Sequence, residues 1–173
     1  PGLILFELLM LTQGGAQYRS AEYQSDHLLL ALPALLFPIC AALRLARFNT
    51  EDDSSGDFKG LSTPAATATV IGYVLVAVVN YFGVSYPPLY DPFPKQNALY
   101  FLCLVLPLLM VSNIGMFSLK FKGMKWKENE IRWIFIGLFI LLLILSPIDA
   151  IIITMMLYIL TNTILHFYRK LTA

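Results

Sequence analysis

The sequence predicts an all-α protein, a polytopic membrane bundle of about six helical segments of which the first is partial. Of its 173 residues, 58% are hydrophobic and only 13% are charged, and the mean hydropathy is +0.70. A soluble domain carries about 25% charged residues. The apolar residues are gathered in long runs, and no second soluble domain interrupts them. We therefore expect one transmembrane domain over residues 1–173.

The N-terminal part of the chain contains two apolar runs. Gly2 to Leu11 is shorter than the roughly 20 residues that a spanning helix needs, and it lacks the basic flank and cleavage site of a signal peptide. We interpret it as the second half of a helix, so that the sequence would be a fragment of a longer protein. Thr12 to Asp26 is predicted to be a polar loop. Leu28 to Phe48 has the length of a full span, in which Pro33 and Pro38 predict a kink.

The middle of the chain contains the next two predicted spans. One runs from about Pro64 to Phe82 and begins with the small residues AATAT, which favour close approach of a neighbouring helix in lipid. Gly83 to Asn97 is rich in proline and aromatic residues, and this composition indicates a loop at the membrane interface. Ala98 to Ser118 is the fourth predicted span, and Leu119 to Glu130 is a short basic loop.

The last apolar run, Ile131 to Tyr168, is too long for one span. The segment Ser146-Pro147-Ile148-Asp149 interrupts it, and proline is poorly tolerated inside a helix. We expect two short helices joined by a tight turn, with Asp149 capping the second helix.

The basic residues predict the orientation. When successive loops are assigned to alternate sides, ten of the 12 Lys and Arg residues fall on one side and two on the other. Cytoplasmic loops carry the excess of Lys and Arg, so the Arg44 to Thr63 hairpin and the C-terminus are predicted to be cytoplasmic. The larger group comprises Arg44, Arg47, Lys59, Lys120, Lys122, Lys125, Lys127, Arg132, Arg169 and Lys170, and the smaller one Arg19 and Lys95.

Several function classes find no support. The basic residues lie at span ends and form no solvated patch, so nucleic acid is not an expected partner. Cys40 and Cys103 lie within apolar runs and indicate neither a disulfide nor a metal site. His27 and His166 are interpreted as interfacial residues. No motif of a serine hydrolase, metalloprotease, P-loop NTPase or zinc site is present. The acidic group Glu51, Asp52, Asp53 and Asp57 is typical of a solvated turn. The basic loop at 119–130, which contains four lysines, is interpreted as a determinant of membrane topology.

The candidate site is the charged hairpin tip within Ala41 to Thr69. Arg44 and Arg47 lie three residues apart, on one face of the end of an apolar helix. A guanidinium there is costly unless it has an anionic partner, and two interpretations stay open: an anchor to lipid phosphates or a substrate ligand. Further along, Thr63 is predicted to cap the next helix and Pro64 to occupy its first turn.

The hairpin carries a resemblance to a known family. RLARFN at 44–49, followed by FKGLSTPAA at 58–66, resembles the hairpin of bacterial phosphatidylserine synthases in the CDP-alcohol phosphotransferase family. The segment FSLKFKGMKWKENEIRWIFI at 117–136 resembles the C-terminal part of such enzymes. The likeness runs over most of the chain. Ser62 departs from the family pattern, which usually has proline at this position.

The resemblance implies transfer of a phosphatidyl group from CDP-diacylglycerol to the hydroxyl of L-serine, with release of CMP. It also implies a homodimer in the bacterial inner membrane and a divalent cation, Mg or Mn. In the family an aspartate motif, D-G-x-x-A-R, then G, then D-x-x-x-D, holds that cation, and this sequence contains no match to it. The motif would then lie upstream of Pro1, so that this chain would hold no catalytic or metal-binding residue and would be inactive alone.

The same resemblance implies which residues bind substrate. Arg44 and Arg47 would contact phosphate or the serine carboxylate. The polar pocket around them would be shaped by Asn49, Lys59, Gly60, Thr63 and Pro64. Three alternatives stay open: a related transferase with inositol phosphate or glycerol phosphate as acceptor, a transporter, or a non-catalytic membrane bundle.

Overall fold

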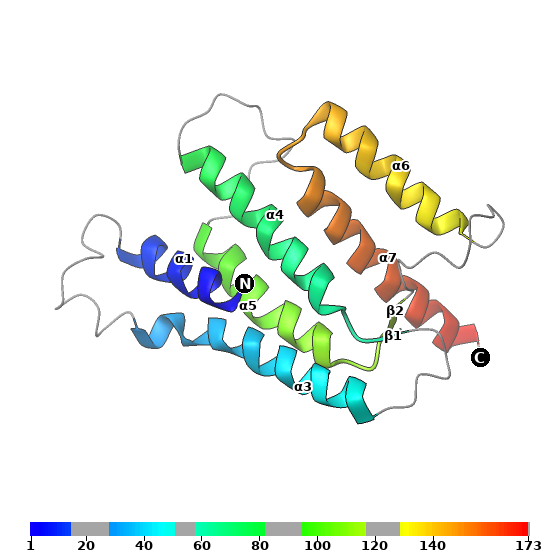
Figure 1. The fold of residues 1–173 in the computed structure, drawn as a ribbon, viewed down its shortest axis with the longest axis horizontal. Coiled ribbons are helices and arrows are strands. Elements are labelled where there is room, and N and C mark those ends of the chain that lie inside the picture. Colours follow the sequence, from blue (N-terminus) through cyan, green and yellow to red (C-terminus); the bar gives the residue numbers. More distant parts are fainter. Residues whose placement is uncertain (15–27, 51–57, 82–94, 117–128, 173) are drawn as a thin grey trace. The chain divides into compact units, whose positions relative to one another are not determined.

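The computed structural model describes residues 1–14, 28–50, 58–81, 95–116 and 129–172, and these are 87% helical. This confirms the predicted helical class. Within these ranges a 3-10 helix, η2 (Leu32–Leu35), leads into α3, and two short strands, β1 (Phe58–Lys59) and β2 (Gly115–Met116), pair with each other. The six α-helices of the described residues are α1 (Gly2–Gly14), α3 (Leu36–Thr50), α4 (Thr63–Tyr81), α5 (Lys95–Val111), α6 (Glu130–Leu145) and α7 (Ala150–Thr172) (Figure 1).

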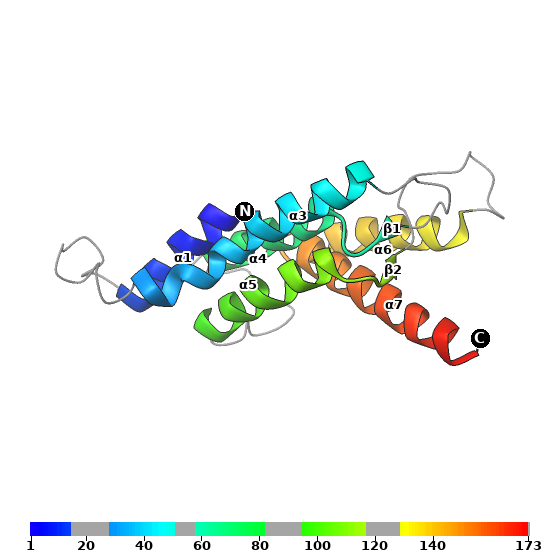
Figure 2. The same ribbon diagram turned by 90° about the horizontal axis from the view of Figure 1, so that it is seen from below.

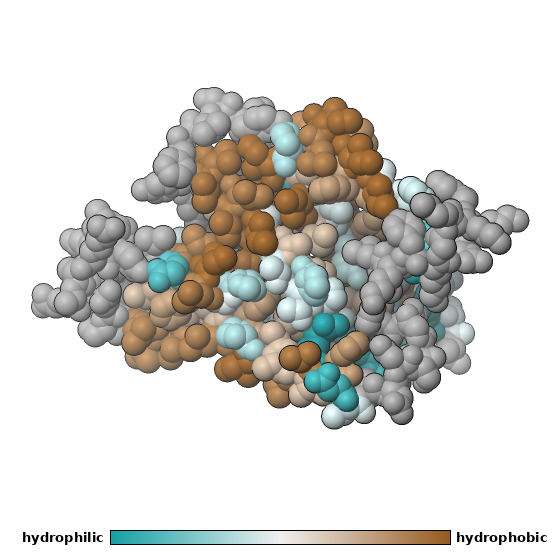
Figure 3. Space-filling view, viewed as in Figure 1, coloured by the Kyte–Doolittle hydropathy of each residue, from teal (hydrophilic) through white to brown (hydrophobic). Residues whose placement is uncertain are grey.

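Among the residues that the structure describes, two helices are long and apolar enough to cross a membrane. They are Leu28–Thr50, which includes η2 and α3, and Ala150–Thr172, which is α7, and each has 23 residues. Thr63–Val79 and Asn97–Val111 are shorter apolar helices. Figure 3 shows that hydrophobic residues dominate much of the visible face. These lengths favour a membrane protein, while the full six-segment polytopic bundle stays a prediction.

The chain divides into two compact units. The first unit comprises residues 1–52 and 91–112, with α1, η2, α3 and α5. The second unit comprises residues 53–90 and 113–173, with β1, α4, β2, α6 and α7. Each unit has its own core.

In the first unit, α5 packs against both α1 and α3. The core includes the fully buried side chains of Leu5, Phe37 and Leu106. Of the two prolines that predict a kink, Pro33 lies at the start of the 3-10 turn η2, after which the helix continues as α3, and Pro38 lies inside α3. A 3-10 turn has tighter hydrogen bonding than an α-helix and changes the direction of side chains. The Tyr100 hydroxyl ties α5 to this region by donating to the Leu30 carbonyl at 3.1 Å.

In the second unit, α7 packs against both α4 and α6 (Figures 1 and 2). The approach to α4 is close at Gly72, where an added Cβ would lie 2.8 Å from the backbone nitrogen of Ile152. On the α6 side, the rings of Phe135 and Tyr158 meet edge to face, with centroids 6.0 Å apart. The helix pair α4 and α7 therefore needs a residue without a side chain at position 72.

The predicted division of the last apolar run is confirmed. α6 ends at Leu145 and α7 begins at Ala150. Asp149 is buried directly before α7, and its carboxylate oxygen Oδ2 accepts a hydrogen bond from the Ser146 hydroxyl at 2.6 Å. The Ser146 amide in turn donates to the Leu142 carbonyl. The turn thus satisfies part of its own buried polar groups, which would otherwise be costly in an apolar environment.

Several predicted boundaries were wrong, among them those of α1 and α5. α1 extends to Gly14, so residues 12–14 are helical and not part of a loop. α5 begins at Lys95, inside the predicted interfacial loop 83–97, and ends at Val111, well before Ser118. The early end has a physical reason, since Gly115 and Met116 leave the helix to pair with β1. The rest of the interfacial loop and residues 119–128 of the predicted basic loop lie outside the described residues, whereas Glu130, the last residue of that predicted loop, is the first residue of α6.

Candidate functional site

The first group of predicted site residues, in the first unit, lies at the C-terminal end of α3. Arg44 is half-buried with its Nε atom shielded from solvent, and Arg47, nearly one turn later, is exposed. Residues three apart on a helix lie within about 60° of one another, so both guanidiniums leave the same side of α3. Figure 3 shows hydrophilic residues over the C-terminal part of this helix.

Arg47 has a partner that the sequence did not predict. Its Nη1 atom donates to the carbonyl oxygen of Val111 at 2.6 Å, and Val111 is the last residue of α5. The last carbonyls of a helix lack partners within the helix and carry its negative dipole end. The Ser112 hydroxyl donates to the carbonyl of Leu109 at 2.8 Å. Arg47 therefore stabilises the end of α5, whatever else it binds.

Asn49 does not share the arginine face. α3 continues to Thr50, whose hydroxyl lies within hydrogen-bond reach of the carbonyls of Ala46 and Arg47. Two residues along an α-helix turn the side-chain direction by about 200°. Asn49 is exposed and leaves α3 on nearly the opposite side from Arg47. The expectation that both shape one pocket is therefore not supported by the helix geometry.

The second group of predicted site residues, in the second unit, lies in the turn that leads from β1 into α4. β1 pairs antiparallel with β2, with Phe58 opposite Met116 and Lys59 opposite Gly115. The buried Gly60 has φ of 74°, a conformation that favours glycine, and its amide donates to the Ile114 carbonyl at 2.8 Å. Lys59 is exposed. The pairing thus fixes the backbone on both sides of Lys59.

The sequence predicts Thr63 as the cap of α4. In the structure the cap is Ser62, one residue earlier. The Ser62 hydroxyl accepts a hydrogen bond from the Ala65 amide at 3.3 Å, and its carbonyl accepts one from Ala66. Thr63 is half-buried as the first residue of α4, and Pro64 is exposed as the second. A serine before the first turn supplies an acceptor to amides that have none within the helix. Ser62 has a structural role that proline could not fill.

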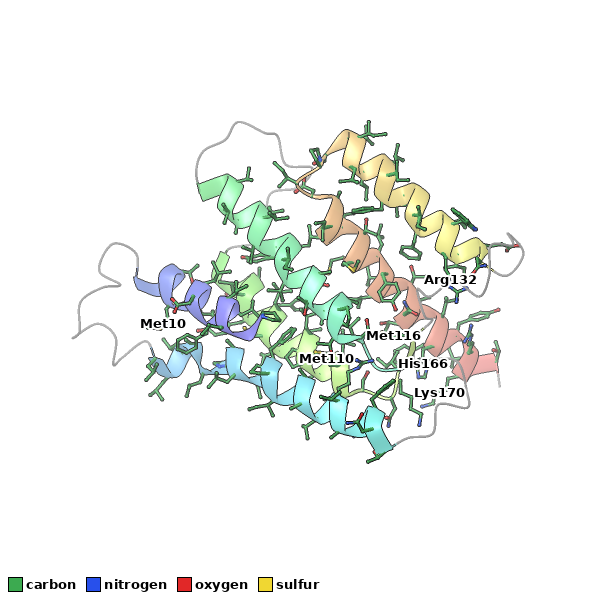
Figure 4. All side chains as sticks on the ribbon, viewed as in Figure 1. Met10, Met110, Met116, Arg132, His166 and Lys170 are labelled. Carbon is green, nitrogen blue, oxygen red and sulfur yellow. The ribbon has the colours of Figure 1, made fainter. Side chains whose placement is uncertain are left out.

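His166 is a residue whose importance the sequence did not indicate. Its Nδ1 atom accepts a hydrogen bond from the Gly115 amide of β2 at 3.2 Å. Figure 4 labels His166 on the C-terminal half of α7 and Met116 on β2, which contacts α7. A lone histidine on an apolar helix gives no local signal of such a bond, since the partner lies far away in the sequence.

The predicted substrate-binding residues fall into two groups, one in each unit. Arg44, Arg47 and Asn49 belong to the first unit and Lys59, Gly60, Thr63 and Pro64 to the second. The acidic loop that links the groups lies outside the described residues. In the described ranges, no group of three or more His, Cys, Asp or Glu residues is placed to hold a metal ion.

No model of a known protein family matches the chain, and no curated protein matches it. The resemblance at the hairpin therefore stays a prediction that depends on the residues quoted for it.

Proposed function

We propose that this chain is part of a membrane-embedded transferase that moves a phosphatidyl group from CDP-diacylglycerol to the hydroxyl of L-serine. The observation that carries the proposal is the arginine pair at the end of α3, which terminates a 23-residue apolar helix. Two cations at such a position suit a lipid substrate whose anionic pyrophosphate lies at the membrane surface. The hairpin motif around the pair adds the family resemblance.

In the proposed reaction, the serine hydroxyl attacks the phosphorus that carries diacylglycerol. A new P–O bond forms, the bond to CMP breaks, and the hydroxyl proton leaves to a base. Catalysis of phosphoryl transfer depends on positioning and on neutralising the negative charge of the oxygens. Arg44 and Arg47 would bind phosphate oxygens or the serine carboxylate. A guanidinium has five donors, so the bond from Arg47 to Val111 leaves others for a substrate.

The remaining features of the proposal rest on the resemblance and on composition. The protein would be a polytopic homodimer in the bacterial inner membrane, with the hairpin and the C-terminus in the cytoplasm. A Mg or Mn ion would be held by the aspartate motif of the family, which this chain does not contain. No step above is assigned to a metal.

The test is serine-dependent release of CMP from CDP-diacylglycerol in detergent, with Mg or Mn present. It is run on this chain and on the protein expressed from the reading frame extended upstream. We expect the extended protein to be active and the chain alone to be silent. Loss of one charge-stabilising donor typically costs about 100- to 1,000-fold in rate, so Arg44→Ala should reduce activity by that order. Arg44→Lys, which keeps the charge but loses the fork of donors, should be intermediate.

Two results would change the proposal. Activity with another alcohol in place of serine would keep the family and overturn the substrate. No release of CMP with any acceptor alcohol would overturn the transferase and favour a non-catalytic membrane bundle.

A further inference from the structure

The two edges of β2 have different partners. Gly60 donates its amide to the Ile114 carbonyl, which marks Gly60 and Ile114 as a hydrogen-bonded pair. In an antiparallel ladder, hydrogen-bonded pairs alternate with pairs that exchange no hydrogen bond. The neighbouring pair, Lys59 and Gly115, is therefore of the second kind. The Gly115 amide points away from β1 and needs a different acceptor.

His166 supplies that acceptor. Its Nδ1 atom lies 3.2 Å from the Gly115 nitrogen, and an accepting Nδ1 places the ring proton on Nε2. The ring is half-buried on α7, which packs against α4 and α6. α7 thus holds one edge of β2 through His166, while β1 occupies the other. All members of this arrangement belong to the second unit.

We propose that His166 is a positioning residue that fixes Lys59 and Gly60 through β2. The path runs from Nδ1 of His166 to the Gly115 amide, along the chain to the neighbouring Ile114, and through the hydrogen bond that the Ile114 carbonyl accepts from Gly60, the residue after Lys59. Strands of two residues each are too short to be stable alone. β1 and β2 hold a defined position because α7 packs against β2 and His166 of α7 accepts a hydrogen bond from the Gly115 amide. His166 itself needs no contact with substrate.

The functional part of this inference rests on the proposed transferase, in which Lys59 and Gly60 shape the substrate pocket. The structural part does not. The test therefore combines hydrogen–deuterium exchange, which needs no activity, with the CMP assay.

Hydrogen–deuterium exchange of backbone amides is measured in detergent on peptides that cover 58–66 and 112–118. The wild type is compared with His166→Leu and His166→Asn. His166→Leu removes the acceptor and keeps an apolar side chain of moderate size. His166→Asn keeps an acceptor, since its Oδ1 atom is at a distance along the side chain similar to that of Nδ1. Loss of one neutral hydrogen bond is worth about 2- to 10-fold in an equilibrium. We expect His166→Leu to speed exchange in both peptides by that factor and His166→Asn to restore it.

Thr163→Val is the matched control, because the Thr163 hydroxyl bonds only within α7, to the Ile159 carbonyl at 2.8 Å. It should leave exchange in both peptides unchanged. Peptides from α4 and α6 report whether each variant is folded. If His166→Leu does not fold, His166→Ala replaces it, since a smaller side chain introduces no clash.

Three outcomes would overturn the proposal. Unchanged exchange in His166→Leu would show that β1 and β2 do not depend on His166. Faster exchange that His166→Asn does not restore would show that the hydrogen bond is not the cause. Full release of CMP by His166→Leu, together with faster exchange in both peptides, would show that the reaction does not depend on the position of β1 and β2. Faster exchange, restored by asparagine, in a protein that releases no CMP would support the positioning role and overturn only the transferase.

Discussion

Ser62 stands where the resembling family usually has proline, and its hydroxyl caps α4 by accepting from the Ala65 amide. Replacing a serine cap by alanine costs about 1 kcal/mol of stability. We expect Ser62→Ala to lower the free energy of unfolding by that amount, measured by thermal unfolding in detergent. Ser62→Asp keeps an acceptor and adds a negative charge at the helix start, which the dipole favours, so it should be as stable as the wild type. Equal melting temperatures for Ser62→Ala and wild type would contradict the role of the cap.

Gly60 is the described residue with a positive φ, 74°. An L-residue in this conformation brings its Cβ close to the following carbonyl, at a cost of about 1–2 kcal/mol. Gly60→Ala should therefore destabilise the turn between β1 and α4 and speed amide exchange in residues 58–66. Gly137→Ala is the control, because an added Cβ there meets nothing within 4 Å and alanine is the better helix former. A Gly60→Ala protein as stable as Gly137→Ala would refute the strain.

At the scale of elements, Arg47 joins the end of α3 to the end of α5. Arg47→Ala should lower stability by about 0.5–1.5 kcal/mol, the usual contribution of a hydrogen bond, and should speed exchange in residues 105–112. Asn49→Ala is the control, since Asn49 is exposed and leaves α3 on another side. Arg47→Lys keeps a cation at the dipole end and should lose less. Arg47→Ala is expected to act on both activity and stability. If it lowers CMP release but is as stable as Asn49→Ala and the wild type, the hydrogen bond from Arg47 to Val111 contributes little to the fold.

The packing of α4 on α7 depends on Gly72. An added Cβ would lie 2.8 Å from the nitrogen and 3.0 Å from the Cα of Ile152, which are backbone atoms that cannot rotate away. Overpacking of a well-packed site costs about 1–3 kcal/mol. Gly72→Ala should therefore lower the melting temperature in detergent, whereas Gly137→Ala should not. An unchanged melting temperature would indicate that α4 and α7 can separate at no cost.

Some elements could be predicted from the sequence and others could not. The approximate positions of the helices were predictable because the helices follow the apolar runs, and the Ser146-Pro147 segment marks where α6 and α7 separate, whereas the ends of α1 and α5 were not predicted correctly. β1 and β2 were not, because two residues have no periodic pattern and the strands lie far apart in the chain. Arg47 was recognised as a residue that needs a partner, but Val111 could not be foreseen from local pattern. Thr63-Pro64 suggested a helix start, and the cap proved to be one residue earlier.

The candidate site was predicted in part for the same reason. The sequence identified residues by type and local spacing, and this was enough to place Arg44 and Arg47 on one helix face. It could not show that Asn49 continues the helix and therefore leaves in another direction. Nor could it show that His166 supports the strand next to Lys59. Each of these facts depends on backbone direction or on a contact between segments distant in sequence.

At the scale of the whole molecule, the distribution of basic residues predicts one orientation for every element. Lys59 and Lys170 should both face the cytoplasm, and Asn97, which begins the apolar part of α5, should lie near the opposite surface. All three side chains are exposed, so single cysteines at these positions, in a Cys40→Ala, Cys103→Ala background, can report sidedness. In vesicles with the cytoplasmic face inside, a membrane-impermeant maleimide should label Asn97→Cys at once. It should label Lys59→Cys and Lys170→Cys only after permeabilisation. If α4, α5, α6 and α7 are all spans, the chain crosses the membrane four times between residues 59 and 170, and both residues lie on the same side. Labelling of Lys59→Cys and Lys170→Cys from opposite sides would therefore contradict the predicted topology.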